Sequence, residues 1–92
     1  MKGFEWNSDK AELNLRKHGV PFSEAVSVFG DSLSATYDDP DHSQEEQRFL
    51  TVGTSRSGRL LIVSLTDRGN SIRIISAREA TRRERIRYEE EP

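Results

Sequence analysis

The stretch IRIISAREATRRERIRY (residues 72–88) changes from strand chemistry to helix chemistry part-way along its length. It begins with β-branched residues, which favour a strand. Two capping boxes follow, Ser76-x-x-Glu79 and Thr81-x-x-Glu84, and either could start a helix. That helix has only Ala80 and Ile86 as clearly apolar positions, too few for a stripe that buries well. The stretch therefore predicts a strand followed by a helix that serves a partner, a polyanion or both.

Charge is divided unevenly along the chain, although the net charge is only −2. Residues 31–47 contain six acidic residues and no lysine or arginine, whereas residues 48–87 contain ten arginines and three acidic residues. Glu89, Glu90 and Glu91 make the tail acidic. Every basic residue after Lys17 is arginine, which suits bidentate contact with phosphate or carboxylate. A salt-bridged surface and an anion-binding face explain this pattern about equally well.

Length and composition limit the class of protein. Ninety-two residues are enough for one small domain, so we expect a single domain over residues 1–92. The absence of cysteine excludes disulfides and thiolate metal sites, and no His, Asp or Glu cluster has metal-ligand spacing. There is no P-loop or glycine-rich dinucleotide turn, so we expect neither a metal nor a cofactor. No apolar run resembles a signal peptide or a membrane span, which favours a cytoplasmic protein without membrane contact.

The order of the expected elements indicates an α+β domain. Phe22, Ala25, Val26 and Phe29 recur at helical spacing, and Gly19 and Gly30 end two successive short helices. In the first helix, Ala11, Leu15 and His18 share a face, and in the core we expect Phe22, Phe29, Leu61 and Val63. Strands are expected over residues 4–6, 33–37, 46–54 and 59–66 and from residue 72. The short turns between successive strands predict an antiparallel meander between the helix pair and the C-terminal helix.

Several ordered motifs resemble those of BrnT-type toxins over about residues 4–89. In the front half they are Phe4-Glu5-Trp6, Asn14-Leu15-x-Lys17-His18-Gly19-Val20-x-Phe22-x-Glu24-Ala25 and Val28-Phe29. In the back half they are Glu46-x-Arg48-Phe49, Gly58-Arg59-Leu60-Leu61 and Ile72-Arg73-Ile74-Ile75-Ser76-Ala77-Arg78-x-Ala80-Thr81-x-x-Glu84-Arg85-x-x-Tyr88-Glu89. The chain departs from the family pattern at Gly30-Asp31-Ser32 and Thr66-Asp67-Arg68, two turns whose changes concern loop geometry rather than the fold.

The resemblance implies a RelE-like fold and a ribonuclease toxin of a type II toxin–antitoxin pair. The implied partners are RNA as substrate and a BrnA-like antitoxin, which binds operator DNA through a ribbon-helix-helix domain. The toxin would then reach DNA only through the antitoxin.

Metal-free RNA cleavage needs residue types that this chain contains. The 2′-OH attacks the adjacent phosphate, and the protein positions the strand, offsets the charge of the transition state and moves protons. We expect Arg78, Arg59, Arg73 and His18 to be catalytic, with His18 as proton shuttle at a helix C-terminus. His18 could instead cap the helix or pack beside Trp6. On a regular strand Arg73 and Arg78 point to opposite faces, so a shared site requires a bend at Ser76.

Further residues are candidates for RNA binding: Lys17, Arg48, Arg82 and Tyr88. Tyr88 could stack on a base, although closing the last helix against the sheet is the more common role for such a tyrosine. His42 lies in an acidic loop and is interpreted as a solvated turn residue.

Three functions compete at this point. The first is an endoribonuclease toxin, and the second is a catalytically silent regulator that docks an antitoxin. The third is a stand-alone nucleic-acid-binding module, which the acidic segment disfavours because it would repel a polyanion.

Overall fold

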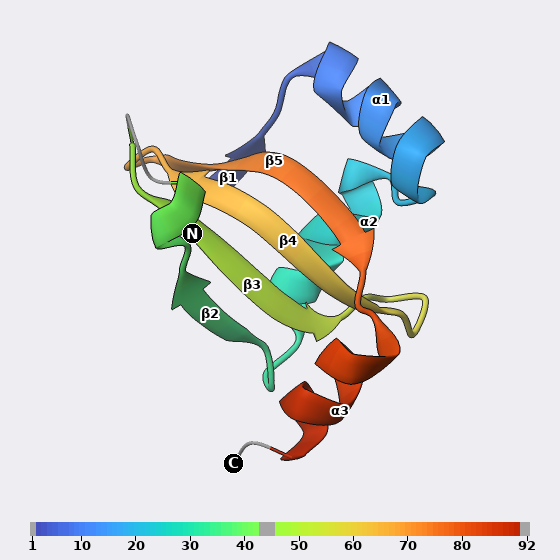
Figure 1. Cartoon of the computed structure of the whole chain (residues 1–92). Coiled ribbons are helices and arrows are strands. Elements are labelled where there is room, and N and C mark those ends of the chain that lie inside the picture. Colours follow the sequence, from blue (N-terminus) through green and yellow to red (C-terminus); the bar gives the residue numbers. More distant parts are fainter. Residues whose placement is uncertain (1, 43–45, 91–92) are drawn as a thin grey trace.

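One five-stranded sheet and three α-helices form an α+β fold (Figure 1). This computed structural model describes residues 2–42 and 46–90. The elements in chain order are β1 (Gly3–Glu5), α1 (Ser8–His18), α2 (Phe22–Ser27), the 3-10 turn η1 (Val28–Gly30), β2 (Ala35–Asp38), the 3-10 turn η2 (Pro40–His42), β3 (Arg48–Thr54), β4 (Leu60–Asp67), β5 (Ser71–Glu79) and α3 (Arg82–Glu90). The α+β prediction is confirmed. Ser43 and Glu45 of the predicted acidic loop, and Glu91 of the tail, lie outside the described residues.

The sheet has the strand order β1-β5-β4-β3-β2. Strands β2 to β5 pair antiparallel with their sequence neighbours, which confirms the predicted meander. Gly58 and Gly69 take φ values of 86° and 80° in the turns on either side of β4, a conformation that glycine adopts without strain. The short N-terminal β1 joins the edge of the sheet parallel to β5. The apolar β4 therefore becomes the central strand, as its sequence predicts.

Helix α2 and the turn η1 lie against the rear face of this sheet in Figure 1, and α1 packs beside β5 at the upper right of that view. The core lies between this helical segment and the sheet, and it contains Phe22 and Val28 from the helical segment and Leu61, Val63 and Ile74 from the sheet. Three of the four predicted core residues are thus buried. Phe29 is only half-buried because η1 ends the helical segment, and its ring lies 5.2 Å from that of Phe4, measured between centroids.

The buried position of α1 is polar, and of the predicted face Ala11 packs against the core while Leu15 and His18 are exposed. Leu15 remains 47% exposed, whereas Asn14 is buried. The Asn14 amide donates to the carbonyl oxygens of Val20 (3.0 Å) and Ala77 (2.8 Å), and its oxygen accepts from the Ala77 amide (3.1 Å). Because this buried amide has its hydrogen-bond partners in both the chain after α1 and β5, it holds α1 against β5 where apolar packing would otherwise do so.

A register shift in β5 changes which residues share a face. Ser76 pairs with Ser64 and Ile74 with Leu65, so that one residue of β5 is left over between the two pairs. Ile74 and Ala77 consequently both reach the core, although they are an odd number of residues apart. The strand irregularity that a common site for Arg73 and Arg78 requires is therefore present.

Helix α3 begins at the second of the two capping boxes. The Thr81 amide donates to Glu84 Oε1 (2.9 Å), and the Glu84 amide donates to Thr81 Oγ1 (3.2 Å). The helix buries no residue and lies at the lower end of the front face in Figure 1. The Tyr88 hydroxyl donates to the Leu33 carbonyl (2.6 Å) and ties α3 to the segment before β2. Among the helices described, none has the length and apolar character to cross a membrane.

Candidate active site

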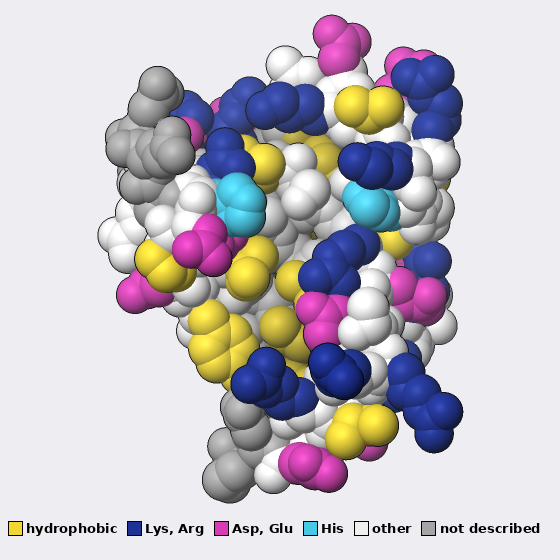
Figure 2. All heavy atoms as spheres, in the orientation of Figure 1, with side chains coloured by type: hydrophobic (Ala, Val, Ile, Leu, Met, Phe, Trp, Pro, Cys, Tyr) yellow, Lys and Arg dark blue, Asp and Glu magenta, His cyan; other side chains and the backbone are white. Residues whose placement is uncertain are grey.

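The sheet face opposite α1 and α2, here called the open face, carries two adjoining hollows. The α3 hollow, of about 350 Å³, lies between the sheet and α3, and the η2 hollow, of about 390 Å³, lies between the sheet and η2. Both are lined by Leu50, Ile62 and Arg78, so the two form one groove. Figure 2 shows hydrophobic side chains within this face and cationic side chains around them.

The η2 hollow combines cationic side chains with a histidine. Arg48 from the start of β3 and Arg78 near the end of β5 line it together with His42 and Asp39. Nδ1 of His42 lies 2.9 Å from Oδ2 of Asp39. Because a carboxylate only accepts, Nδ1 carries a proton, and in the neutral imidazole Nε2 is then the acceptor. The His42 side chain is 66% exposed and the Asp39 side chain 13%, so the imidazole is accessible while its partner is sheltered.

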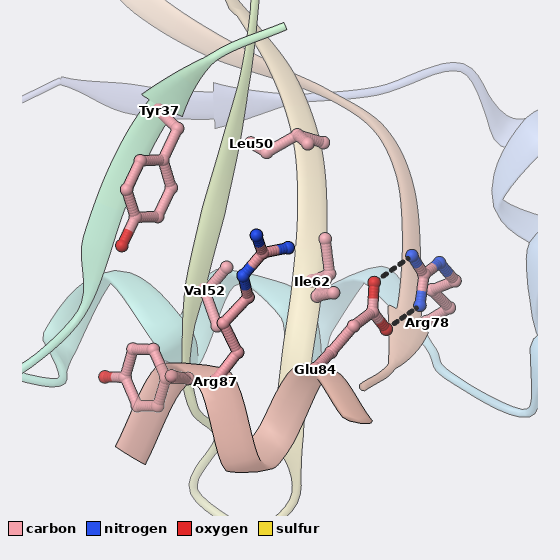
Figure 3. Close-up of a pocket in the computed structure, with 8 residues that line it drawn as sticks. Tyr37, Leu50, Val52, Ile62, Arg78, Glu84 and Arg87 are labelled. Carbon is pink, nitrogen blue, oxygen red and sulfur yellow. Dashed lines mark hydrogen bonds and ion pairs between the residues drawn. The ribbon is translucent and has the colours of Figure 1, made fainter. Parts of the chain in front are cut away.

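Glu84 fixes the guanidinium of Arg78 in this groove. Two hydrogen bonds, of 2.7 and 2.9 Å, join the Arg78 nitrogens to the two carboxylate oxygens of Glu84 (Figure 3). The Arg78 guanidinium and the Thr81 amide together lower the pKa of Glu84 to about 2, so this carboxyl is ionised at neutral pH. The bidentate geometry orients the plane of Arg78. The side chain is still 42% exposed and can meet an anion with its remaining donors.

Arg59, which the sequence makes a catalytic candidate, is engaged away from both hollows. It donates to both carboxylate oxygens of Glu24 (2.9 and 2.5 Å) and to the Gly19 carbonyl (3.1 Å). Hydroxyls of Ser55 and Ser57 also donate to Glu24, at 2.7 and 2.5 Å. These contacts join α2 to the turn between β3 and β4. They give Arg59 a positioning role, and a catalytic role for it stays a prediction.

The other predicted site residues are dispersed. Arg73 donates to Glu5 (2.8 Å) at the β1 edge of the sheet. Lys17 and His18 are exposed in the last turn of α1, and Arg82 is exposed at the start of α3. None of these four residues lines either of the two hollows. Of the predicted residues, the groove brings together only Arg78, Arg48 and Tyr88.

Comparison with known proteins identifies the family. The family model described as "Ribonuclease toxin, BrnT, of type II toxin-antitoxin system" matches residues 6–84, most of the chain. The chain belongs to the BrnT family. The resemblance seen in the sequence is confirmed.

A BrnT structure has the same fold. The crystal structure of the Brucella abortus ribonuclease toxin BrnT matches with a TM-score of 0.65 at 19% identity, over 89% of this chain and 100% of that chain. A search of curated proteins gave no match.

In this BrnT-family chain His42 lies in the turn η2 with an exposed side chain, which confirms its interpretation as a solvated turn residue. Its pairing with Asp39 was not predicted. The available signal was the i, i+3 spacing of Asp39 and His42, because a 3-10 turn brings such side chains together. Within residues 2–42 and 46–90, no group of three or more His, Asp or Glu could hold a metal ion.

The salt-bridged interpretation of the charge pattern holds for part of this BrnT-family chain. Ion pairs join Lys2 to Asp67, Arg68 to Glu46 and Arg73 to Glu5 on the surface. Arg87, in contrast, has no ion pair or hydrogen bond with the described residues. The paired arginines form a salt-bridged surface, and an anion-binding face stays a prediction.

Proposed function

We propose that this chain is a metal-independent endoribonuclease with its catalytic centre in the η2 hollow. The observation that carries the proposal is the meeting of Arg78, Arg48 and the His42–Asp39 pair in one hollow. Membership of the BrnT family of ribonuclease toxins supports RNA as the substrate.

The residues of the hollow match the needs of cleavage by transesterification. His42 Nε2 takes the proton of the ribose 2′-OH, whose oxygen then forms a bond to the adjacent phosphorus. The bond between phosphorus and O5′ breaks, and O5′ gains a proton from solvent. Arg78 and Arg48 offset the negative charge that grows on the phosphate oxygens during this step. The products are a 2′,3′-cyclic phosphate and a 5′-hydroxyl.

The predicted residues outside the hollow have other proposed roles. Lys17, His18 and Arg82 are exposed cationic or titratable side chains, which suit contacts with phosphates further along the strand. Arg73 and Arg59 act through Glu5 and Glu24, which they hold in place. Tyr88 fixes α3 beside the groove.

Family membership also supports a protein partner. Toxins of type II systems are paired with an antitoxin, and we propose a BrnA-like protein in this role. Free toxin would inhibit growth by cutting RNA in the cytoplasm, and the complex would reach operator DNA through the antitoxin alone.

Digestion of a single-stranded RNA in the presence of a metal chelator tests the proposal. We expect cleavage with 2′,3′-cyclic phosphate ends, and loss of about 10²-fold or more in rate for His42→Ala, since general base catalysis typically contributes 10²–10⁴-fold. Arg83→Ala, in a residue that lines neither hollow, is the matched control and should cleave as the unmodified protein does. A folded protein that binds the antitoxin but leaves RNA intact would support the silent regulator instead.

A further inference from the structure

We propose that the α3 hollow is a nucleobase subsite that selects guanine beside the cleaved phosphate. This inference rests on the proposed function and deepens it, because it assigns to the same groove a preference for sequence. The subsite is distinct from the η2 hollow but shares Arg78 with it.

The α3 hollow has the size and lining of a place for a flat, partly apolar ring. Leu50, Val52 and Ile62 form its floor on the sheet, and its volume is about 350 Å³. Tyr37 stands at one side of this floor (Figure 3) and remains 47% exposed although it is aromatic. Bases splayed out of single-stranded RNA stack on such side chains. An unstacked base would therefore cover apolar surface that water now contacts.

Arg87 is the polar group available to read the edge of that base. Its guanidinium extends from α3 into the hollow in Figure 3 and has no hydrogen bond or ion pair with the described residues. Glu84 is engaged by Arg78, and the Tyr88 hydroxyl donates to the Leu33 carbonyl. Arg87 is therefore the group that offers a base two donors side by side.

The paired donors of Arg87 and the size of the hollow together favour guanine. Guanine presents two adjacent acceptors, O6 and N7, which match the paired donors of a guanidinium. Adenine places a donor amino group beside N7. In uracil the acceptors O4 and O2 are separated by the N3–H donor. Unpaired cytosine has adjacent acceptors at O2 and N3, but its single ring covers less of the apolar floor than a purine does. Guanine is the base that combines paired acceptors with the larger stacking surface.

The groove also sets where this base lies in the strand. Arg78 borders both hollows, so a phosphate at Arg78 and a base on the Leu50–Ile62 floor belong to neighbouring positions of one strand. Arg78 and Arg87 flank the apolar floor with positive charge, which favours a polyanion over an apolar peptide segment of an antitoxin.

Binding of four oligonucleotides tests the subsite without requiring catalysis. The probes are single-stranded RNA oligomers with 2′-O-methyl groups, which cannot be cleaved, and they carry G, A, C or U at one position in an otherwise uniform sequence. Fluorescence anisotropy measures their affinity for the full chain. We expect the G oligomer to bind about tenfold more tightly than the A oligomer, as is typical for one bidentate base contact.

Matched variants separate base reading from stacking. Arg87→Gln should abolish the preference for G, whereas Arg85→Gln on the same helix, in a residue that lines neither hollow, should retain it. Tyr37→Ala should lower the affinity for all four oligomers about tenfold. Tyr37→Phe keeps the ring and should leave the affinity unchanged. Equal affinity for the four oligomers, or a preference that survives Arg87→Gln, would overturn the subsite.

Cleavage mapping distinguishes this inference from the proposed function. Cleavage of ordinary RNA with no base preference would overturn the subsite and leave the endoribonuclease standing. A preference for G in binding, without cleavage, would support the subsite and contradict the proposed catalysis. Protection of Tyr37 by the antitoxin together with equal affinity for all four oligomers would assign the hollow to the protein partner and overturn the subsite.

Discussion

Glu24 is the residue on which the connection between α2 and the β3–β4 turn depends. Its carboxylate accepts hydrogen bonds from Ser55, Ser57 and Arg59 in a buried position. Arg59 is partly exposed and regains water when its partner charge is removed, so Glu24→Gln should lower the free energy of unfolding by about 1–3 kcal/mol. Urea denaturation measures this change, and Glu12→Gln on the exposed side of α1 is the control. Equal urea midpoints for the two variants would show that the hydrogen bonds of Glu24 do not contribute to stability.

The same carboxyl makes stability depend on pH. Arg59 holds the pKa of Glu24 at about 2 in the folded protein, against 4.5 as its ordinary value. A lowered pKa contributes stability that is complete above about pH 4.5 and is lost as the pH falls towards 2. Glu84, whose pKa is also about 2, titrates in the same window. Melting temperature followed from pH 6 to pH 2 should therefore fall more steeply for the unmodified protein than for Glu24→Gln, and parallel curves would contradict this assignment.

The residue types in the sequence indicated which chemistry the candidate site could perform. They indicated less well which residues form that site. Arg78 and Arg48, two of the predicted residues, line the same hollow, and their roles stay predictions. The partners of a charged side chain depend on tertiary contacts that sequence spacing does not reveal, since Arg59 and Glu24 lie 35 residues apart. His42 was discounted because its acidic surroundings also fit a solvated loop.

At the level of elements, α3 depends on the capping box that starts it. Thr81→Ala removes the hydroxyl that accepts from the Glu84 amide, which should cost about 1 kcal/mol and fray the first turn. Hydrogen exchange of the α3 amides measures the fraying. Ser76→Ala, in the alternative box that lies within β5, should leave these amides unchanged. If the α3 amides exchange at the same rate in both variants, the capping box at Thr81 does not stabilise the helix.

Strand β5 shows where periodicity alone fails. Regular alternation would put Ile74 on the same face as Ser76, whereas the bulge brings Ile74 and Ala77 to the core. Alternation was correct up to the bulge, and the need for a bend at Ser76 followed from requiring Arg73 and Arg78 on one face. Bulges depend on pairing with the neighbouring strand, so they are not visible in the sequence of one strand.

At the scale of the whole molecule, α2 and η1 cover one face of the sheet, and the other face carries the groove beside α3. The meander followed from its short turns, and the N-terminal strand was also expected. Its parallel pairing with β5 joins residues about 68 positions apart, such as Glu5 and Arg73, and local patterns carry no information on such contacts.

The division of charge predicts how RNA binding responds to salt. Three or four arginine or lysine contacts with phosphates should give a slope of about −2 to −3 for log affinity against log salt, since each single-strand contact contributes about −0.7. Arg48→Ala should flatten the slope by about one contact. Anisotropy titrations at several salt concentrations measure the slope, and a flat profile would contradict phosphate neutralisation.

The rate of RNA cleavage by Arg78→Ala tests the catalytic centre most directly. The variant is compared with the unmodified protein and with Arg83→Ala, after circular dichroism has shown that all three are folded. We expect kcat/KM to fall about 10²–10³-fold for Arg78→Ala, as for the loss of one donor that stabilises a transition-state anion, and to stay unchanged for Arg83→Ala. Undiminished cleavage by a folded Arg78→Ala protein would contradict the assignment of the active site to the open face.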